Sequence, residues 1–75
     1  MDLESNLLGR YGPKFQICVL FRSDGEIDVS ICDEKAARWI TIAEGNVLSE
    51  VVVIACAKLE GESPDQVSHL EIKEG

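Results

Sequence analysis

The stretch that decides the fold is FRSDGEIDV, residues 21–29, because it places an Asp-Gly turn between two segments that alternate in hydrophobicity. Every second residue on each side is large and apolar: Phe15, Ile17, Val19 and Phe21 before the turn, then Ile27, Val29 and Ile31 after it. A period of two on both sides of a turn predicts two antiparallel strands. We therefore expect a β-hairpin with strands at about 14–22 and 26–32.

The length of the loop fixes the register of this hairpin. A three-residue loop, Ser23–Gly25, pairs Phe21 with Ile27, whereas a two-residue loop would pair Phe21 with Asp28. The three-residue loop gathers the apolar side chains on one face, and a slip by one residue would turn one strand's apolar set towards water. It also puts Gly25 at the left-handed position of the turn, where a missing Cβ avoids a steric cost. The sequence predicts the three-residue loop.

The period changes after the hairpin. Asp33 is a favourable helix N-cap, Gly45 suits the position just after a helix, and one helical stripe lies between them: Ala36, Trp39, Ile40 and Ala43. This pattern predicts a helix at about 34–44 that packs Trp39 against the hairpin.

One or two further helices are expected towards the carboxyl end. A helix at about 47–60 is predicted by a second apolar stripe: Leu48, Val51, Val52, Ala55 and Leu59. The β-branched run at 51–54 leaves an alternative in which 47–57 is a third strand of a ββαβ arrangement. Ser63-Pro64-Asp65-Gln66 is typical of a helix start, so a short third helix at about 64–73 is one interpretation. The alternation of Leu70 and Ile72 leaves an extended segment as the alternative.

These elements predict an α+β fold, a hairpin covered by two or three helices, in a single domain spanning residues 1–75. Residues 1–13 are expected to form a flexible or loosely packed amino-terminal arm. A hairpin alone is marginally stable in water, so helices or a second chain must cover its apolar face.

The chain lacks the motifs of the common catalytic and metal-binding sites. It has three cysteines without a CxxC spacing, one histidine, His69, and no glycine-rich phosphate-binding motif. We therefore predict a protein that is not an enzyme, with no catalytic residues, no cofactor and no metal. Unpaired cysteines suit a reduced cytoplasm, and no run of about 18 apolar residues suggests a membrane span.

Net charge is the remaining feature of the sequence that suggests a function. Fourteen acidic residues against seven basic ones give a net charge of −7. Such a chain is expected to bind neither nucleic acid nor an anionic membrane directly, because phosphates attract basic surfaces. One interpretation is that the acids only keep a small protein soluble. The sharper hypothesis is an inhibitor or adaptor that mimics nucleic acid and binds a basic, nucleic-acid-binding protein.

Phage-type anti-defence proteins provide an analogy for this hypothesis, in size and charge only. The candidate contact residues are Glu26, Asp28 and Glu34, with Tyr11 as an apolar anchor. The alternative function is a small structural or assembly subunit that uses the apolar edge of the hairpin for homo- or hetero-oligomerisation. A homodimer through that edge is the corresponding expectation.

Overall fold

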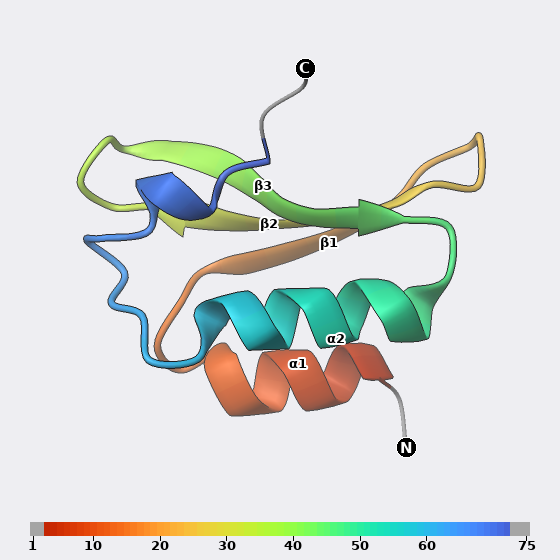
Figure 1. Cartoon of the computed structure of the whole chain (residues 1–75), viewed down its shortest axis with the longest axis horizontal. Coiled ribbons are helices and arrows are strands. Elements are labelled where there is room, and N and C mark those ends of the chain that lie inside the picture. The colour runs from red at the N-terminus through yellow and green to blue at the C-terminus, as the bar shows by residue number, and fades with distance from the viewer. Residues whose placement is uncertain (1–2, 73–75) are drawn as a thin grey trace.

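The computed structural model describes residues 3–72 and has the element order helix, three strands, helix and a short 3-10 turn. The bounds are α1 Leu3–Tyr11, β1 Ile17–Phe21, β2 Ile27–Asp33, β3 Arg38–Gly45, α2 Leu48–Leu59 and η1 Ser68–Leu70. The strands form one antiparallel sheet in the order β1-β2-β3. Both helices lie side by side on the same side of this sheet (Figure 1). The α+β class is confirmed.

The register of the first hairpin is confirmed as well. Phe21 lies opposite Ile27, and the pairs Val19–Val29 and Ile17–Ile31 follow along the two strands. The N–H of Arg22 donates to the carbonyl of Glu26 at 2.8 Å, which closes the three-residue loop. Gly25 has φ +91°. This is the left-handed conformation expected at this position, which glycine adopts easily because it has no side chain.

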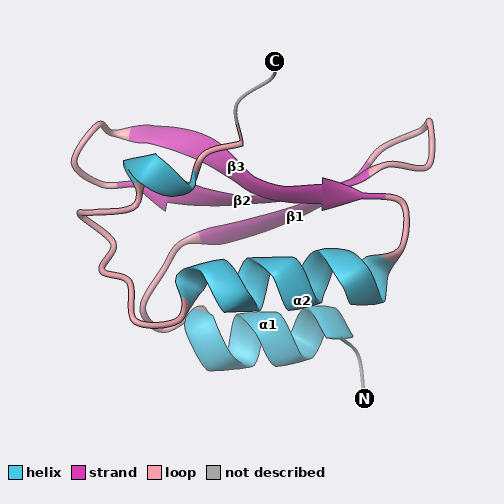
Figure 2. Ribbon diagram, viewed as in Figure 1, coloured by secondary structure: helices cyan, strands magenta, loops and turns pink. Residues whose placement is uncertain are grey.

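The helix expected at 34–44 is wrong, because most of this segment is β3 (Figure 2). Asp33 does accept a hydrogen bond from the N–H of Ala36, at 3.3 Å, which is the bond of a helix N-cap. The chain then turns back at Ala37, which has a φ of +55°, and pairs with β2. Trp39 faces away from the helices and is 52% exposed, so it is not the packing residue that was expected.

A β-bulge explains why the strand period of β3 is hidden in the sequence. Val29 pairs with Ala43 and Ser30 pairs with Thr41, so Ile42 is an extra residue without a partner on β2. Ile40, Ile42 and Ala43 are all buried as a result. Two neighbouring inward residues break the alternation and leave a pattern that resembles a helical stripe.

Replacing Ala37 by glycine distinguishes a turn from a helix by the sign of its effect. At a φ of +55° an alanine is strained and a glycine is not, so Ala37→Gly should raise the free energy of unfolding by about 0.5–1 kcal/mol. In an exposed helix the same change would lower it by about 1 kcal/mol. Urea denaturation of the two proteins measures the difference, and a loss of stability would contradict the turn.

The helix expected at 47–60 is confirmed as α2, and the alternative of a third strand at 47–57 is wrong. Its stripe packs on the sheet as predicted, with four buried residues: Val51, Val52, Ala55 and Leu59. Helix α2 contacts β3 and β2, and it also contacts α1. Burial of this stripe outweighs the modest cost of β-branched residues in a helix, which is a few tenths of a kcal/mol each.

A third α-helix at 64–73 does not form in the described part of this range, which ends at residue 72. Ser63 begins only a turn, in which its carbonyl accepts the N–H of Gln66 at 2.9 Å, and η1 is a single 3-10 turn. Val67 is fully buried and holds the segment to the core. The N–H of Ile72 then donates to the carbonyl of Thr41 on β3, at 2.9 Å.

Helix α1 occupies most of the range expected to be a loosely packed arm; residues 1 and 2 lie outside the described residues. Leu7 is fully buried and Tyr11, one turn later, is 9% exposed. Both belong to the same hydrophobic core as the sheet and α2. Tyr11 also packs near Phe15, with ring centroids 6.5 Å apart.

Candidate protein-binding surface

Four carboxylates gather where the β1–β2 turn meets the end of β3. Asp24 and Glu26 come from the turn, Asp28 from β2 and Glu44 from β3, and we call this group the acidic end. Two rules of local geometry bring them together. The turn needs Asp24 and Gly25 to close, and antiparallel pairing places Glu44 directly opposite Asp28.

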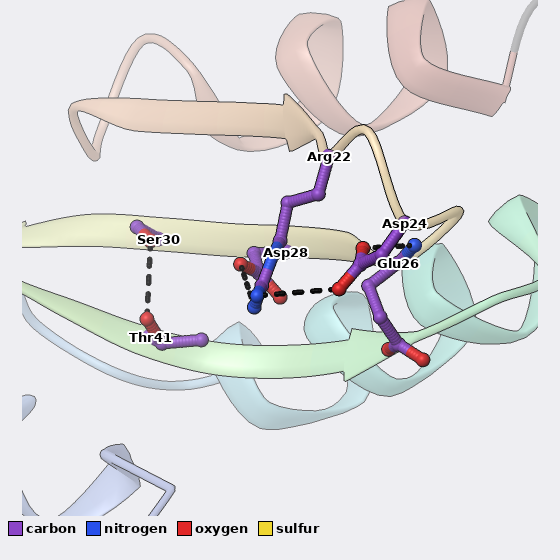
Figure 3. A network of polar contacts seen from close by, with 6 residues as sticks. All are labelled: Arg22, Asp24, Glu26, Asp28, Ser30 and Thr41. Carbon is purple, nitrogen blue, oxygen red and sulfur yellow. Dashed lines mark hydrogen bonds and ion pairs between the residues drawn. The ribbon is translucent and has the colours of Figure 1, made fainter.

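One cation, Arg22, lies among these carboxylates (Figure 3). Its guanidinium is 3.3 Å from Asp24 Oδ2 and 3.7 Å from Asp28 Oδ2. Asp24 also accepts the N–H of Glu26 at 3.0 Å, while the Glu26 carboxylate points away from Arg22. The Arg22 and Asp24 side chains are about half exposed, at 48% and 53%, and pairs of this kind contribute roughly 0–1 kcal/mol. Arg22 therefore neutralises the acidic end only in part.

Asp28 is more buried than Asp24 and Glu44, which are both exposed. Its side chain is 15% exposed, and its Oδ1 atom is buried without a hydrogen-bond partner among the described residues. Glu44 faces it across the β2–β3 pair, and like charges in directly opposite positions destabilise a sheet. The acidic end thus combines an unsatisfied acceptor with an unfavourable pair.

A shallow hollow of about 300 Å³ lies beside this pair. It is lined by Arg22, Asp28, Thr41, Glu44, Glu71 and Ile72. Glu71 arrives from the carboxyl-terminal segment, where Arg38 holds it through two hydrogen bonds of 2.9 and 2.8 Å. Hydrogen bonding to Glu71 and its negative charge raise the pKa of Arg38. With Glu71 held by Arg38, two carboxylates, Asp28 and Glu44, lie beside the Arg22 guanidinium, and this balance favours a cationic group in the hollow.

The structure brings together two of the four residues expected from the sequence to contact a partner. Glu26 and Asp28 belong to the acidic end. Glu34 lies just beyond the other end of β2, beside the β2–β3 turn, and Tyr11 is buried in the core. Glu44 and Glu71 were missed, because each reaches the hollow only through a pairing that the predicted helices excluded.

Other reactive groups are scattered over the described residues. Cys18 is exposed, whereas Cys32 and Cys56 are half-buried, and all three are free thiols. Burial raises the pKa of the Cys56 thiol, which lowers its thiolate fraction at neutral pH. His69 lies 3.2 Å from Glu62. Between residues 3 and 72, no group of three or more His, Cys, Asp or Glu side chains is placed to hold a metal ion.

No helix within residues 3–72 has the length and apolar character needed to cross a membrane. In comparisons with protein-family models, with curated proteins and with solved structures, none matches this chain.

Proposed function

We propose that this chain is a non-enzymatic, acidic protein-interaction module that acts as an inhibitor or adaptor of a basic, nucleic-acid-binding partner protein. The observation that carries the proposal is the pair Asp28–Glu44, two carboxylates opposite each other in the sheet, with one arginine of the described residues, Arg22, beside Asp28. Such a pair costs folding free energy in the isolated protein. A cationic surface docked on the acidic end would turn that cost into a favourable interaction.

The net charge of −7 supports the same proposal at longer range. A strongly acidic surface attracts a basic partner before contact and accelerates association. It also repels nucleic acid, so the chain competes with nucleic acid for the partner and does not bind nucleic acid itself. Screening by salt should weaken such a complex steeply, since the Debye length falls to about 8 Å at physiological ionic strength.

Two matched variants test whether the acidic end is the contact surface. Glu26→Gln, Asp28→Asn and Glu44→Gln together remove three charges there, while Glu34→Gln, Glu60→Gln and Asp65→Asn remove three elsewhere. The net charge changes from −7 to −4 in both. In a pull-down from the native host, identified by mass spectrometry, we expect the first variant to lose the nucleic-acid-binding partner and the second to keep it.

The same pull-down at low and at physiological salt completes this test. Capture by the unmodified protein should fall about tenfold or more between the two conditions. Equal losses in both variants would show that net charge alone acts and would contradict a localised surface. If the amount of partner captured did not change with salt concentration, the electrostatic proposal would be contradicted altogether.

A second candidate function is a small structural or assembly subunit that uses the edge of β1. Arg22 N–H donates to Glu26, just before β2, and Gln16 C=O accepts from Cys32 of β2. The alternate residues of β1, Ile17, Val19 and Phe21, therefore direct their backbone groups to the open edge. Phe21 is 54% exposed there. A homo-oligomer or a partner strand joined through backbone hydrogen bonds and apolar contacts would barely respond to salt, so the salt series separates the two candidates.

A further inference from the structure

Neither α1 nor α2 covers the opposite face of the sheet, and within residues 3–72 several side chains of that face are exposed. Ile27, Val29 and Ile31 are buried in the core that the sheet shares with α1 and α2, so the alternate residues of β2 point the other way. Residues opposite each other in an antiparallel sheet share a face, which places β1 and β3 side chains beside them. We call this the outer sheet face.

Three rows of side chains cross the outer sheet face from strand to strand. Cys32 and Trp39 form the row near the β2–β3 turn, Cys18, Ser30 and Thr41 form the middle row, and Leu20, Asp28 and Glu44 form the row at the acidic end. The middle row consists of small side chains, and its two hydroxyls lie 3.4 Å apart (Figure 3). The side chains of the middle row therefore protrude less from the sheet than the larger side chains of the rows on either side.

Large apolar side chains are exposed on both sides of that low row. Trp39 is 52% exposed and Leu20 is 53% exposed. An aromatic residue of this size is a typical anchor of a protein interface when a partner covers it. The face therefore offers apolar contact area near both of its ends.

Charge distinguishes one end of the face from the other. The row with Leu20 also holds Asp28 and Glu44, and the hollow beside them opens at the same end. A lysine or arginine side chain placed in this hollow would lie beside the carboxylates of Asp28 and Glu44, which line it. The face thus has an exposed apolar side chain near each end, small side chains between them, and carboxylates at one end.

We propose that the outer sheet face is the docking surface for an amphipathic α-helix of the basic partner, which makes this inference dependent on the proposed function. The helix would place apolar side chains between Leu20 and Trp39 and a cationic side chain in the hollow at Asp28 and Glu44. Two strand spacings measure roughly 10 Å, about the diameter of a helix with its side chains. Strand addition at β3 is disfavoured because Ile72 already bonds to Thr41 there.

Helix α2 carries the competing apolar surface. Val53 is 65% exposed and Ile54 is 42% exposed, and with Ser49 and Glu50 they line a groove of about 430 Å³. This groove has one carboxylate, so a basic helix has less reason to choose it. Its occupation is the main alternative that the experiment must detect.

The probe is a synthetic amphipathic helical peptide of leucine and lysine without tryptophan, with a leucine and glutamate peptide as its control. Trp39 is the single tryptophan of the chain, so its fluorescence reports on the outer sheet face directly. We expect the lysine peptide to shift the emission to shorter wavelength and the glutamate peptide to leave it unchanged. Amide chemical-shift changes should map to the rows of the outer face and spare Ser49–Ile54.

Two exposed apolar positions provide matched variants. Leu20→Ser should weaken binding of the lysine peptide about tenfold, whereas Val53→Ser should leave it unchanged. Both side chains are more than half exposed, so both variants should keep the amide spectrum of the folded protein. Weakening by Val53→Ser alone, or shift changes on α2, would overturn the proposal in favour of the α2 groove.

The triple variant of the acidic end separates this inference from the proposed function. If it loses the lysine peptide while Leu20→Ser binds normally and Trp39 emission does not move, the acidic end is the contact and the outer sheet face is not. If it binds the lysine peptide as well as the unmodified protein does, charge at that end plays no part. Normal binding by the triple variant would overturn both proposals. Loss of binding by the triple variant alone would overturn only the proposal for the outer sheet face.

Discussion

Leu7→Ala should lower the free energy of unfolding by about 2–5 kcal/mol, the usual cost of removing most of a buried leucine side chain. Leu7 is fully buried in the core, although it lies in a helix near the amino terminus. A domain of this size has roughly 5 kcal/mol or somewhat more to lose. About 0–3 kcal/mol or somewhat more would remain, so we expect the urea transition to move to a much lower concentration, as titrations followed by circular dichroism would measure.

Leu8→Ala is the matched control, since the same substitution falls on the next residue of α1. Leu8 is 39% exposed, and its truncation should change the stability by about 1 kcal/mol or less. Equal, small effects of the two substitutions would mean that α1 contributes little to the core. In that case the expectation of a loosely packed arm would describe residues 3–13 better than the packed helix does.

The sequence alone could not identify α1, because the signals for a helix in residues 3–11 are weak. The helix has nine residues and contains Gly9, and isolated helices this short do not form in water. Leu7 and Tyr11 lie one turn apart, but two apolar residues at that spacing are common in any chain. What stabilises α1 is contact with α2 and the sheet, and such contacts are not encoded locally.

In residues 14–45 the hairpin was predicted correctly and the helix at 34–44 was not. The difference is that the hairpin depends on local sequence, whereas β3 depends on a long-range pairing. The β1–β2 register depends on strict alternation and a three-residue loop, all within 18 positions of the sequence, and it was predicted correctly. The bond from Ala36 N–H to Asp33 was also implicit in the sequence, because a helix cap and a tight turn share it. Whether the chain then continues as a helix or as β3 is decided by pairing with β2.

The candidate surface, like the fold, was predicted correctly near the β1–β2 turn and missed where it depends on β3 and the carboxyl-terminal segment. Glu26 and Asp28 are close to the turn whose geometry was correct, and they do lie together. Glu44 joins them because of β3, and Glu71 because the carboxyl-terminal segment returns to Arg38. Composition indicated an acidic surface, but only the pairing of β2 with β3 shows that one carboxylate of this surface faces another.

The second large effect is expected at Gly12, where α1 ends. Gly12→Ala should lower the free energy of unfolding by about 1–3 kcal/mol, because the added methyl group cannot be accommodated. A Cβ atom at this position would lie 2.2 Å from the carbonyl oxygen of Leu8, far inside van der Waals contact. That oxygen also accepts the N–H of Gly12 at 2.8 Å, so relieving the clash breaks the bond that closes the helix.

Gly9→Ala provides the opposite result in the same helix. An added Cβ at Gly9 meets no atom within 4 Å, and alanine is favoured over glycine in a helix by about 0.5–1 kcal/mol. We therefore expect Gly9→Ala to stabilise the protein and Gly12→Ala to destabilise it, both measured by urea denaturation. If Gly12→Ala also stabilised the protein, the helix would have to continue past Tyr11, and the connection that directs Phe15 into the core would need a different path. The two glycines would then be equivalent helix positions, which the contact at Leu8 forbids.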